Sequence, residues 1–142
     1  MIGGSRRHIF STEKIVEMLI HVTDCNLQNK NKNTALMLAI SHSGTYSNMK
    51  TVEMLIPVSD CNHQDKYGWT ALMYASRYSG RDSTEKTVEM LIHVTNCNLQ
   101  SEDGWTALMI ASRYSDSMIV VEMFIPVSNC NLQNKEGWTS LM

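Results

Sequence analysis

The sequence predicts an all-α fold, a solenoid of stacked helix-loop-helix repeats joined by arms that end in β-turns or hairpin-like bends. The first observation is a recurring string: residues 68–79 reappear as 104–115, more weakly as 32–43, and in part as 137–142. The second is its period, because the threonines of the four copies (Thr34, Thr70, Thr106 and Thr139) are 36, 36 and 33 residues apart. Such a period is typical of solenoids, in which each unit packs only on its neighbours.

The composition is that of an ordinary globular protein, with 43% hydrophobic and 18% charged residues among 142. Twelve basic residues against fourteen acidic ones leave a formal charge of −2. Nucleic-acid binding surfaces carry a marked basic excess, so nucleic acid is not expected as a partner. The chain has neither a run of about 18 apolar residues nor a signal-peptide pattern. We therefore expect no membrane association and an intracellular, reducing, cytoplasmic location.

The cysteines follow the repeat period, at Cys25, Cys61, Cys97 and Cys130. Neighbouring helices in a stack lie roughly 10 Å apart, whereas a disulfide needs Cα atoms within about 7 Å. A zinc site is excluded in the same way, because each unit carries a single cysteine. We expect four free thiols that act as small buried hydrophobes, with no metal.

A capped amphipathic helix is predicted within residues 11–28. Ser-Thr-Glu precedes apolar residues at the i, i+3 and i+4 positions, Val16, Leu19 and Ile20. The string Val-Glu-Met-Leu-Ile recurs at 52–56 and 88–92, and as Val-Glu-Met-Phe-Ile at 121–125, so each unit should contain this second helix. Lysine and glutamate three residues apart should form pairs on its solvated face, Lys14–Glu17, Lys50–Glu53 and Lys86–Glu89.

The stretch between one unit's second helix and the next unit's first helix should be an extended arm with a tight turn, because residues 59–68 are rich in Asn, Asp and Gly. Thr70 then stands before Ala-Leu-Met-Tyr-Ala, where it should cap a short first helix. Thr34, Thr106 and Thr139 should do the same in their units. Residues 79–83 link the first helix to the second, and the corresponding link, 115–118, is shorter. Length changes collect in loops, which disturb no stacking contact.

The string from Asn62 through Gly68-Trp69-Thr70-Ala71-Leu72-Met73-Tyr74-Ala75-Ser76 resembles the ankyrin repeat, over about residues 11–142. The resemblance implies a single ankyrin repeat domain, 1–142, with a half repeat at 11–28, repeats at about 29–64, 65–100 and 101–133, and a partial repeat at 134–142. Alanine or serine stands where the family has proline, at Ala35, Ala71, Ala107 and Ser140.

Methionine replaces the family's histidine, and eight of the eleven methionines fall at two repeat positions. We expect them to pack in the core, at Met37, Met73, Met109 and Met142, and at Met18, Met54, Met90 and Met123. The first unit supplies only a second helix and the last stops at Leu141 and Met142. We therefore expect the chain to be a piece of a longer array or a truncated gene product. If it is not part of a longer array, we expect a monomer.

Motifs that carry catalysis do not occur: there is no Gly-rich phosphate loop, no Gly-x-Ser-x-Gly and no His-Glu-x-x-His, and the five histidines are scattered. We expect neither enzymatic activity nor a cofactor. The resemblance to ankyrin repeats implies instead that the chain binds another protein through its turns and first helices.

Among the family's contact positions carried over to this sequence, which also include Glu102 and Asp103, nine form the candidate binding site, rich in the tryptophan, tyrosine and arginine that dominate protein interfaces. They are Lys66, Tyr67, Trp69, Arg77 and Tyr78 in one unit, Trp105, Arg113 and Tyr114 in the next, and Trp138 in the last. Stacking should align them into one surface on the concave side. Two alternatives stay open: the tryptophans could simply pack on neighbouring turns, or the chain could be a passive spacer or a fragment of a longer array without binding activity of its own.

Overall fold

The computed structural model describes residues 12–42, 47–78 and 84–142. Its elements are α1 (Thr12–Leu19), α2 (Ala35–Ser41), α3 (Ser47–Leu55), the 3-10 turn η1 (Ile56–Val58), α4 (Ala71–Tyr78), α5 (Thr84–Ile92), α6 (Ala107–Tyr114) and α7 (Met118–Phe124). The described ranges contain no strand. The predicted all-α fold is confirmed. None of the helices within these ranges is both long and apolar enough to cross a membrane.

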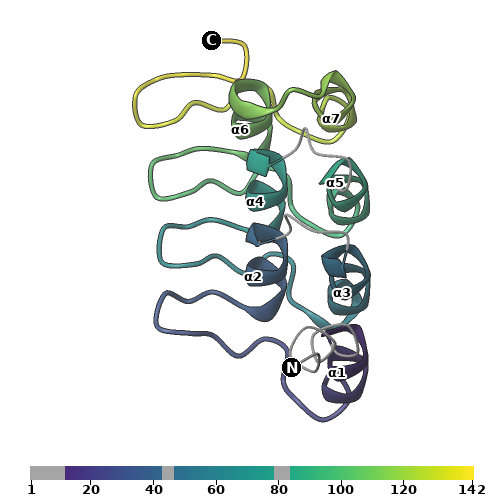
Figure 1. The fold of residues 1–142 in the computed structure, drawn as a ribbon. Coiled ribbons are helices and arrows are strands. Elements are labelled where there is room, and N and C mark those ends of the chain that lie inside the picture. Colours follow the sequence, from purple (N-terminus) through teal and green to yellow (C-terminus); the bar gives the residue numbers. More distant parts are fainter. Residues whose placement is uncertain (1–11, 43–46, 79–83) are drawn as a thin grey trace, which may run out of the picture.

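The helices form two columns, shown in Figure 1. α2, α4 and α6 stack on one another in an inner column, and α1, α3, α5 and α7 stack in an outer column. Long arms extend from the inner column to the side opposite the outer helices. We define the arms as residues 24–33, 60–69, 96–105 and 129–138. The predicted link at 79–83 lies outside the described residues, whereas the shorter link joins α6 to α7 within three residues.

Threonine caps start the inner helices. The side chain of Thr70 accepts a hydrogen bond from the amide of Met73 at 3.2 Å. Thr34 and Thr106 cap α2 and α6 in the same way. The prediction for Thr139 was wrong, because residues 140 and 141 form only a turn, closed by a 3.3 Å bond from the Met142 amide to the Thr139 carbonyl. This bond spans three residues, whereas an α-helical turn is closed by a bond that spans four.

Each arm ends in the predicted tight turn. Gly68 lies at a φ of +75°, in the left-handed region that glycine adopts most easily, and Gly104 and Gly137 lie close to it. The carboxylate of Asp65 organises its turn by accepting the amides of Tyr67 and Trp69 at 2.8 and 3.0 Å. Side-chain acceptance of this kind satisfies backbone donors that the turn itself leaves unpaired.

Hydrogen bonds connect each arm to the next, and we call this set the arm ladder. In one set of rungs an asparagine side chain accepts the backbone amide of the following arm: Asn26 from Asp60 at 2.6 Å, Asn62 from Asn96 at 2.7 Å, and Asn98 from Asn129 at 2.7 Å. Glutamine side chains add further rungs, Gln64 to the carbonyl of Gln100 and Gln100 to that of Gln133. Backbone amides that donate to carbonyls of the preceding arm complete the ladder: Lys66 to Asn31, Glu102 to Tyr67 and Lys135 to Asp103.

The core lies between the two columns. Leu36, Leu72 and Leu108 from the inner helices and Val88 and Phe124 from the outer ones are buried. Met37, Met73 and Met109 pack in this core, as predicted. Met54, Met90 and Met123 are only partly buried. Met18 and Met142 are exposed, which contradicts the prediction, because no described unit lies beyond either of them.

The cysteines are free, as predicted, but their burial differs. Cys61 and Cys97 are buried, Cys25 is partly buried and Cys130 is exposed. The prediction of four buried thiols was therefore wrong for Cys130. Cys61 and Cys97 belong to the hydrophobic core cluster, whereas Cys130 lies in the last arm.

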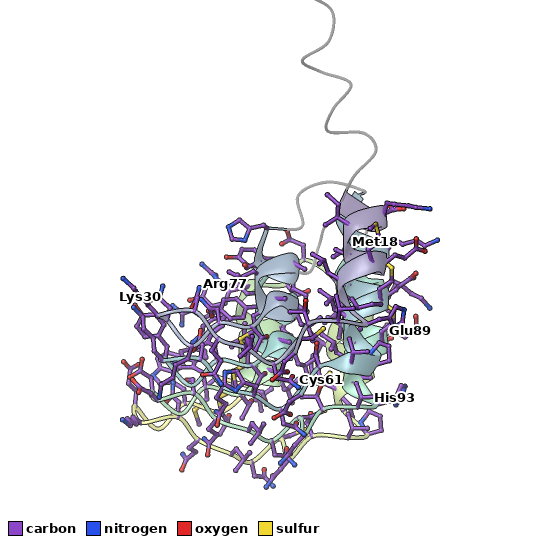
Figure 2. The ribbon with its side chains drawn as sticks, turned by 90° about the horizontal axis from the view of Figure 1, so that it is seen from below. Met18, Lys30, Cys61, Arg77, Glu89 and His93 are labelled. Carbon is purple, nitrogen blue, oxygen red and sulfur yellow. The ribbon has the colours of Figure 1, made fainter. Side chains whose placement is uncertain are left out.

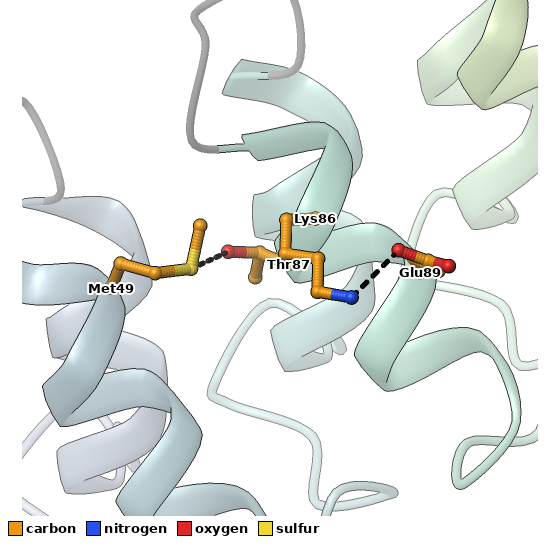
Figure 3. Close-up of polar contacts among 4 residues, drawn as sticks. All are labelled: Met49, Lys86, Thr87 and Glu89. Carbon is orange, nitrogen blue, oxygen red and sulfur yellow. Dashed lines mark hydrogen bonds and ion pairs between the residues drawn. The ribbon is translucent and has the colours of Figure 1, made fainter.

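The outer column carries few polar contacts between side chains. Figure 3 shows the hydroxyl of Thr87 on α5 donating to the sulfur of Met49 on α3, at 3.8 Å, and the ion pair of Lys86 with Glu89 at 3.0 Å. The other two predicted lysine–glutamate pairs do not reach ion-pair distance in the described structure. An exposed ion pair of this kind contributes at most about 1 kcal/mol to the stability of the fold, so it does not determine the structure.

Candidate functional site

The nine predicted contact residues lie on the arms and at the ends of the inner helices. Lys66, Tyr67 and Trp69 belong to the arm 60–69, and Arg77 and Tyr78 end α4. The next unit repeats this arrangement with Trp105, Arg113 and Tyr114, and Trp138 lies in the last arm. In Figure 2, Arg77 lies on the side of the inner column that faces the arms, whereas Glu89 and His93 lie toward the outer column. We call the nine residues the aromatic stripe.

Most of the aromatic stripe is accessible to solvent. Lys66, Arg77 and Arg113 are exposed, and so are Tyr67, Tyr78, Tyr114 and Trp138. Trp69 and Trp105 are half-buried, and they pack against the hydrophobic core. These two tryptophans therefore have a structural role in the turns in addition to any contact that their exposed edges make.

Stacked cations connect the members of the stripe. The guanidinium carbon of Arg77 lies 3.8 Å from the ring centre of Tyr114, so this contact joins α4 to α6 across two units. Arg113 lies 5.6 Å from the ring centre of Trp105 and 5.5 Å from that of Tyr114. These distances fall within the range of about 6 Å over which a cation is attracted to a ring face. The contacts hold the arginines in place over the inner helices.

The two arginines of the stripe have no acidic partner in the described part of the chain. The one ion pair found there joins Lys86 and Glu89 on an outer helix. A guanidinium that stacks through its face keeps the N–H donors along its edge available. Arg77 and Arg113 can therefore donate hydrogen bonds to a carboxylate or a carbonyl oxygen that approaches from solvent.

Two shallow pockets lie along the stripe. One has a volume of about 280 Å³ and is lined by Tyr67, Trp69, Tyr74, Arg77 and Tyr78. The other, of about 170 Å³, lies between α6 and the last arm, and its lining includes Trp105, Arg113 and Trp138. Both pockets combine tryptophan with arginine from the same repeat positions. The stripe thus offers similar binding features at two successive places along the stack.

Tyr74 is a member of the first pocket that the sequence analysis missed. Its hydroxyl donates to the second carboxylate oxygen of Asp65 at 2.5 Å, and its ring centre is 5.1 Å from that of Trp69. Burial raises the pKa of Tyr74 above its ordinary value, and the hydrogen bond and charge of Asp65 raise it further. The sequence does carry a signal for this contact. Asp and Tyr occur together at these two repeat positions only in this unit, while the next unit has Ser101 and Ile110 there.

Clustered histidine, cysteine and carboxylate side chains would be needed to hold a metal ion. The ranges that the structure describes contain no group of three or more His, Cys, Asp or Glu side chains suited to a metal ion.

The repeats of this chain match a known protein family. A family model described as ankyrin repeats, in three copies, matches residues 8–93 and 78–142. No curated protein shows a significant match to the chain. Ankyrin repeats are in general protein–protein interaction modules without catalytic activity. The matched residues cover most of the sequence, and the stacked helix pairs, the glycine turns and the threonine caps agree with the match: the chain belongs to the ankyrin repeat family.

Proposed function

We propose that this chain binds another protein through the aromatic stripe and has no catalytic role. The observation that carries the proposal is the stacking of Arg77 on Tyr114, 3.8 Å apart, which joins residues of two units into one exposed surface. Tyrosine, tryptophan and arginine are the side chains that contribute most to protein interfaces. The four unpaired cysteines favour a reducing, cytoplasmic setting for this binding.

The partner should present acidic or carbonyl groups next to an apolar side chain. The two pockets on the stripe are lined by aromatic rings, which bury large areas at modest entropic cost. The edges of Arg77 and Arg113 can donate paired hydrogen bonds to a carboxylate. A segment that places apolar side chains in the pockets and carbonyl or carboxylate groups between them fits both features.

The test compares three forms of the chain. In the stripe variant, Arg77, Tyr78 and Tyr114 are each replaced by alanine. In the control variant, Lys14, Glu53 and His93 are replaced by alanine, since these are equally exposed residues of the outer column and its adjoining turn. Each form is immobilised and incubated with cytosolic extract, and the captured proteins are quantified by mass spectrometry. Circular dichroism confirms that all three forms keep their helix content.

We expect a captured protein that is enriched by the wild type and the control but not by the stripe variant. With that protein purified, calorimetry should give a dissociation constant weakened tenfold or more in the stripe variant, one decade being about 1.4 kcal/mol. Loss of two anchors of about 2 kcal/mol each would exceed this. Capture that is equal in all three folded forms, or no capture above background, would show that the stripe is not a binding surface and would favour the spacer alternative.

A further inference from the structure

The two arginines of the aromatic stripe converge on one ring. The guanidinium carbon of Arg77 lies 3.8 Å from the ring centre of Tyr114, and that of Arg113 lies 5.5 Å from the same centre. The two guanidinium carbons are therefore at most about 9 Å apart, a separation at which like charges on a protein surface still repel each other. Among the described residues, neither arginine forms an ion pair that would offset this repulsion.

A phosphoryl group fits between two guanidinium groups at this separation. The carbon of a guanidinium lies about 4 Å from the phosphorus of a phosphoryl group that it binds with two hydrogen bonds, so one phosphoryl group can bridge two such carbons about 8 Å apart. It offers three acceptor oxygens and a charge of about −1.5 to −2 at neutral pH. A carboxylate offers two oxygens and a single charge, and its two oxygens are both used when it pairs with one arginine.

The first pocket of the stripe lies next to the arginine pair, because Arg77 belongs to both. Aromatic rings make up the rest of its lining, and its volume of about 280 Å³ admits a side chain that contains a ring. The rings of Trp69 and Tyr74 lie 5.1 Å apart and are tilted by 47°, so they form two walls at an angle to each other. A third ring can pack against such walls in the offset or edge-to-face arrangements that aromatic side chains prefer. A group attached to that ring then lies beside the guanidinium of Arg77.

The charges around this pocket favour an anion. The carboxylate of Asp65 is buried, and its oxygens accept hydrogen bonds from its own unit. Between Asp65 and the end of α4, the exposed charged residues are Lys66 and Arg77, and both are positive. The acidic Glu102 of the next unit holds the repeat position of Lys30, which Figure 2 shows at the far end of its arm, away from Arg77.

We propose that the partner segment bound by the aromatic stripe carries a phosphotyrosine. Its ring enters the first pocket beside Trp69 and Tyr74, and its phosphoryl group accepts hydrogen bonds from Arg77 and Arg113. A phosphoserine would reach the arginines but leave the pocket without a ring, and an unphosphorylated tyrosine would fill the pocket but leave the arginines without an anion. This inference rests on the proposed function, because it specifies the chemistry of the partner for the same surface.

The test measures the binding of peptide mixtures to the whole chain. Three fluorescent mixtures have the same randomised flanking positions, and their fixed central residue is phosphotyrosine, tyrosine or phosphoserine. Each mixture is titrated with the wild type and with the variants Arg77→Gln and Arg113→Gln, and fluorescence anisotropy gives the dissociation constant. Lys50→Gln is the matched control, since this exposed residue of α3 in the outer column loses the same charge. Circular dichroism establishes that every variant is folded.

We expect the wild type and Lys50→Gln to bind the phosphotyrosine mixture at least about tenfold more tightly than either of the other two mixtures, because hydrogen bonds to a charged group contribute this much. Each arginine variant should bind the phosphotyrosine mixture about tenfold more weakly and the tyrosine mixture almost unchanged. The further variant Arg113→Lys should lie in between, because lysine keeps the charge but loses the paired donors of the guanidinium.

Several results would overturn the inference. These are equal binding of the phosphotyrosine and tyrosine mixtures, equal binding of the phosphotyrosine and phosphoserine mixtures, no measurable binding of the phosphotyrosine mixture, or an equal loss in Lys50→Gln and in the arginine variants. The capture experiment described above then separates this inference from the proposed function. If the stripe variant still loses a protein that the wild type captures, only the phosphotyrosine assignment is wrong. If capture is equal in all folded forms, both proposals are wrong.

Discussion

Cysteine shows how the same residue at the same repeat position meets different surroundings. Burial raises the pKa of the Cys61 thiol above its ordinary value, and the neighbouring charge of Asp60 raises it further. Burial also raises the pKa of Cys97, although a hydrogen bond with its own backbone opposes the change. Cys130 is exposed to solvent. The sequence predicts where these residues fall in the repeat, but their exposure depends on whether another unit follows.

This difference predicts the order in which the thiols react. Alkylation requires the thiolate, so a raised pKa and burial both slow it. In the native protein at about pH 8, Cys130 should be modified by iodoacetamide first and Cys25 second, with Cys61 and Cys97 at least about tenfold slower. Peptide mass spectrometry over a time course measures this order, and a urea-unfolded sample, in which all four should react alike, is the control. Equal native rates would show that the inner thiols are not protected.

The aromatic stripe illustrates the limit of sequence reasoning for single residues. The repeat positions of Trp105 and Trp138 could be read directly from the period. The stacking of Arg77 on Tyr114 could not, because it depends on how far one inner helix lies from the next. The bond between Tyr74 and Asp65 was missed for a related reason, since nine residues separate the two and only the folded turn brings them together.

Among the elements, the arms show the clearest relation between a turn and its neighbour. Gly68, Gly104 and Gly137 have nearly the same positive φ. A Cβ added to Gly104 would lie 2.8 Å from the Cα of Asn134 in the next arm, which is closer than side chains approach backbone. A Cβ added to Gly137 would have no neighbour within 4 Å. At Gly104, glycine is therefore needed both for its positive φ and for the close approach of the next arm. At Gly137, it is needed for the positive φ alone.

We predict that Gly104→Ala destabilises the protein more than Gly137→Ala does. Both changes place an alanine in the left-handed region, at a cost of about 1–2 kcal/mol. At Gly104 the clash with the next arm adds about 1–3 kcal/mol, the usual cost of overpacking. Urea unfolding followed by circular dichroism gives the free energy of unfolding of each variant. Equal losses would mean that the arms can separate freely at this position.

Helix positions were more predictable than arm contacts. The threonine caps and the apolar spacing placed the helices that became α4 and α6 within a residue or two of their observed bounds. The arm ladder was not anticipated, because most of its donors are backbone amides, which leave no mark in the sequence, and its glutamine donors reach the next arm only in the folded stack. Its acceptors Asn26, Asn62 and Asn98 were visible only as repeated turn residues.

At the scale of the whole molecule, the period determined most of what could be predicted. A repeat of 33 to 36 residues implies that neighbours stack, and the two columns follow from the two helices of each unit. The ends were harder, because burial there depends on what lies next to a unit and not on the unit's own residues. The repeat positions of Met142 and Cys130 predicted that both are buried, but both are exposed.

The arm ladder also has a mechanical consequence. Each step from one arm to the next is carried by a few hydrogen bonds, such as those from Gln100 to Gln133 and from Lys135 to Asp103. The steps are arranged in series along the stack, so a tension applied to the two chain ends loads every step equally and the weakest one yields first. Each released unit of 33 to 36 residues lengthens the chain by about 110 to 130 Å at full extension. A single-molecule pulling record should therefore show successive small releases, and one simultaneous release of the whole array would contradict this. The molecule under load is an extensible tether that lengthens by one unit at a time.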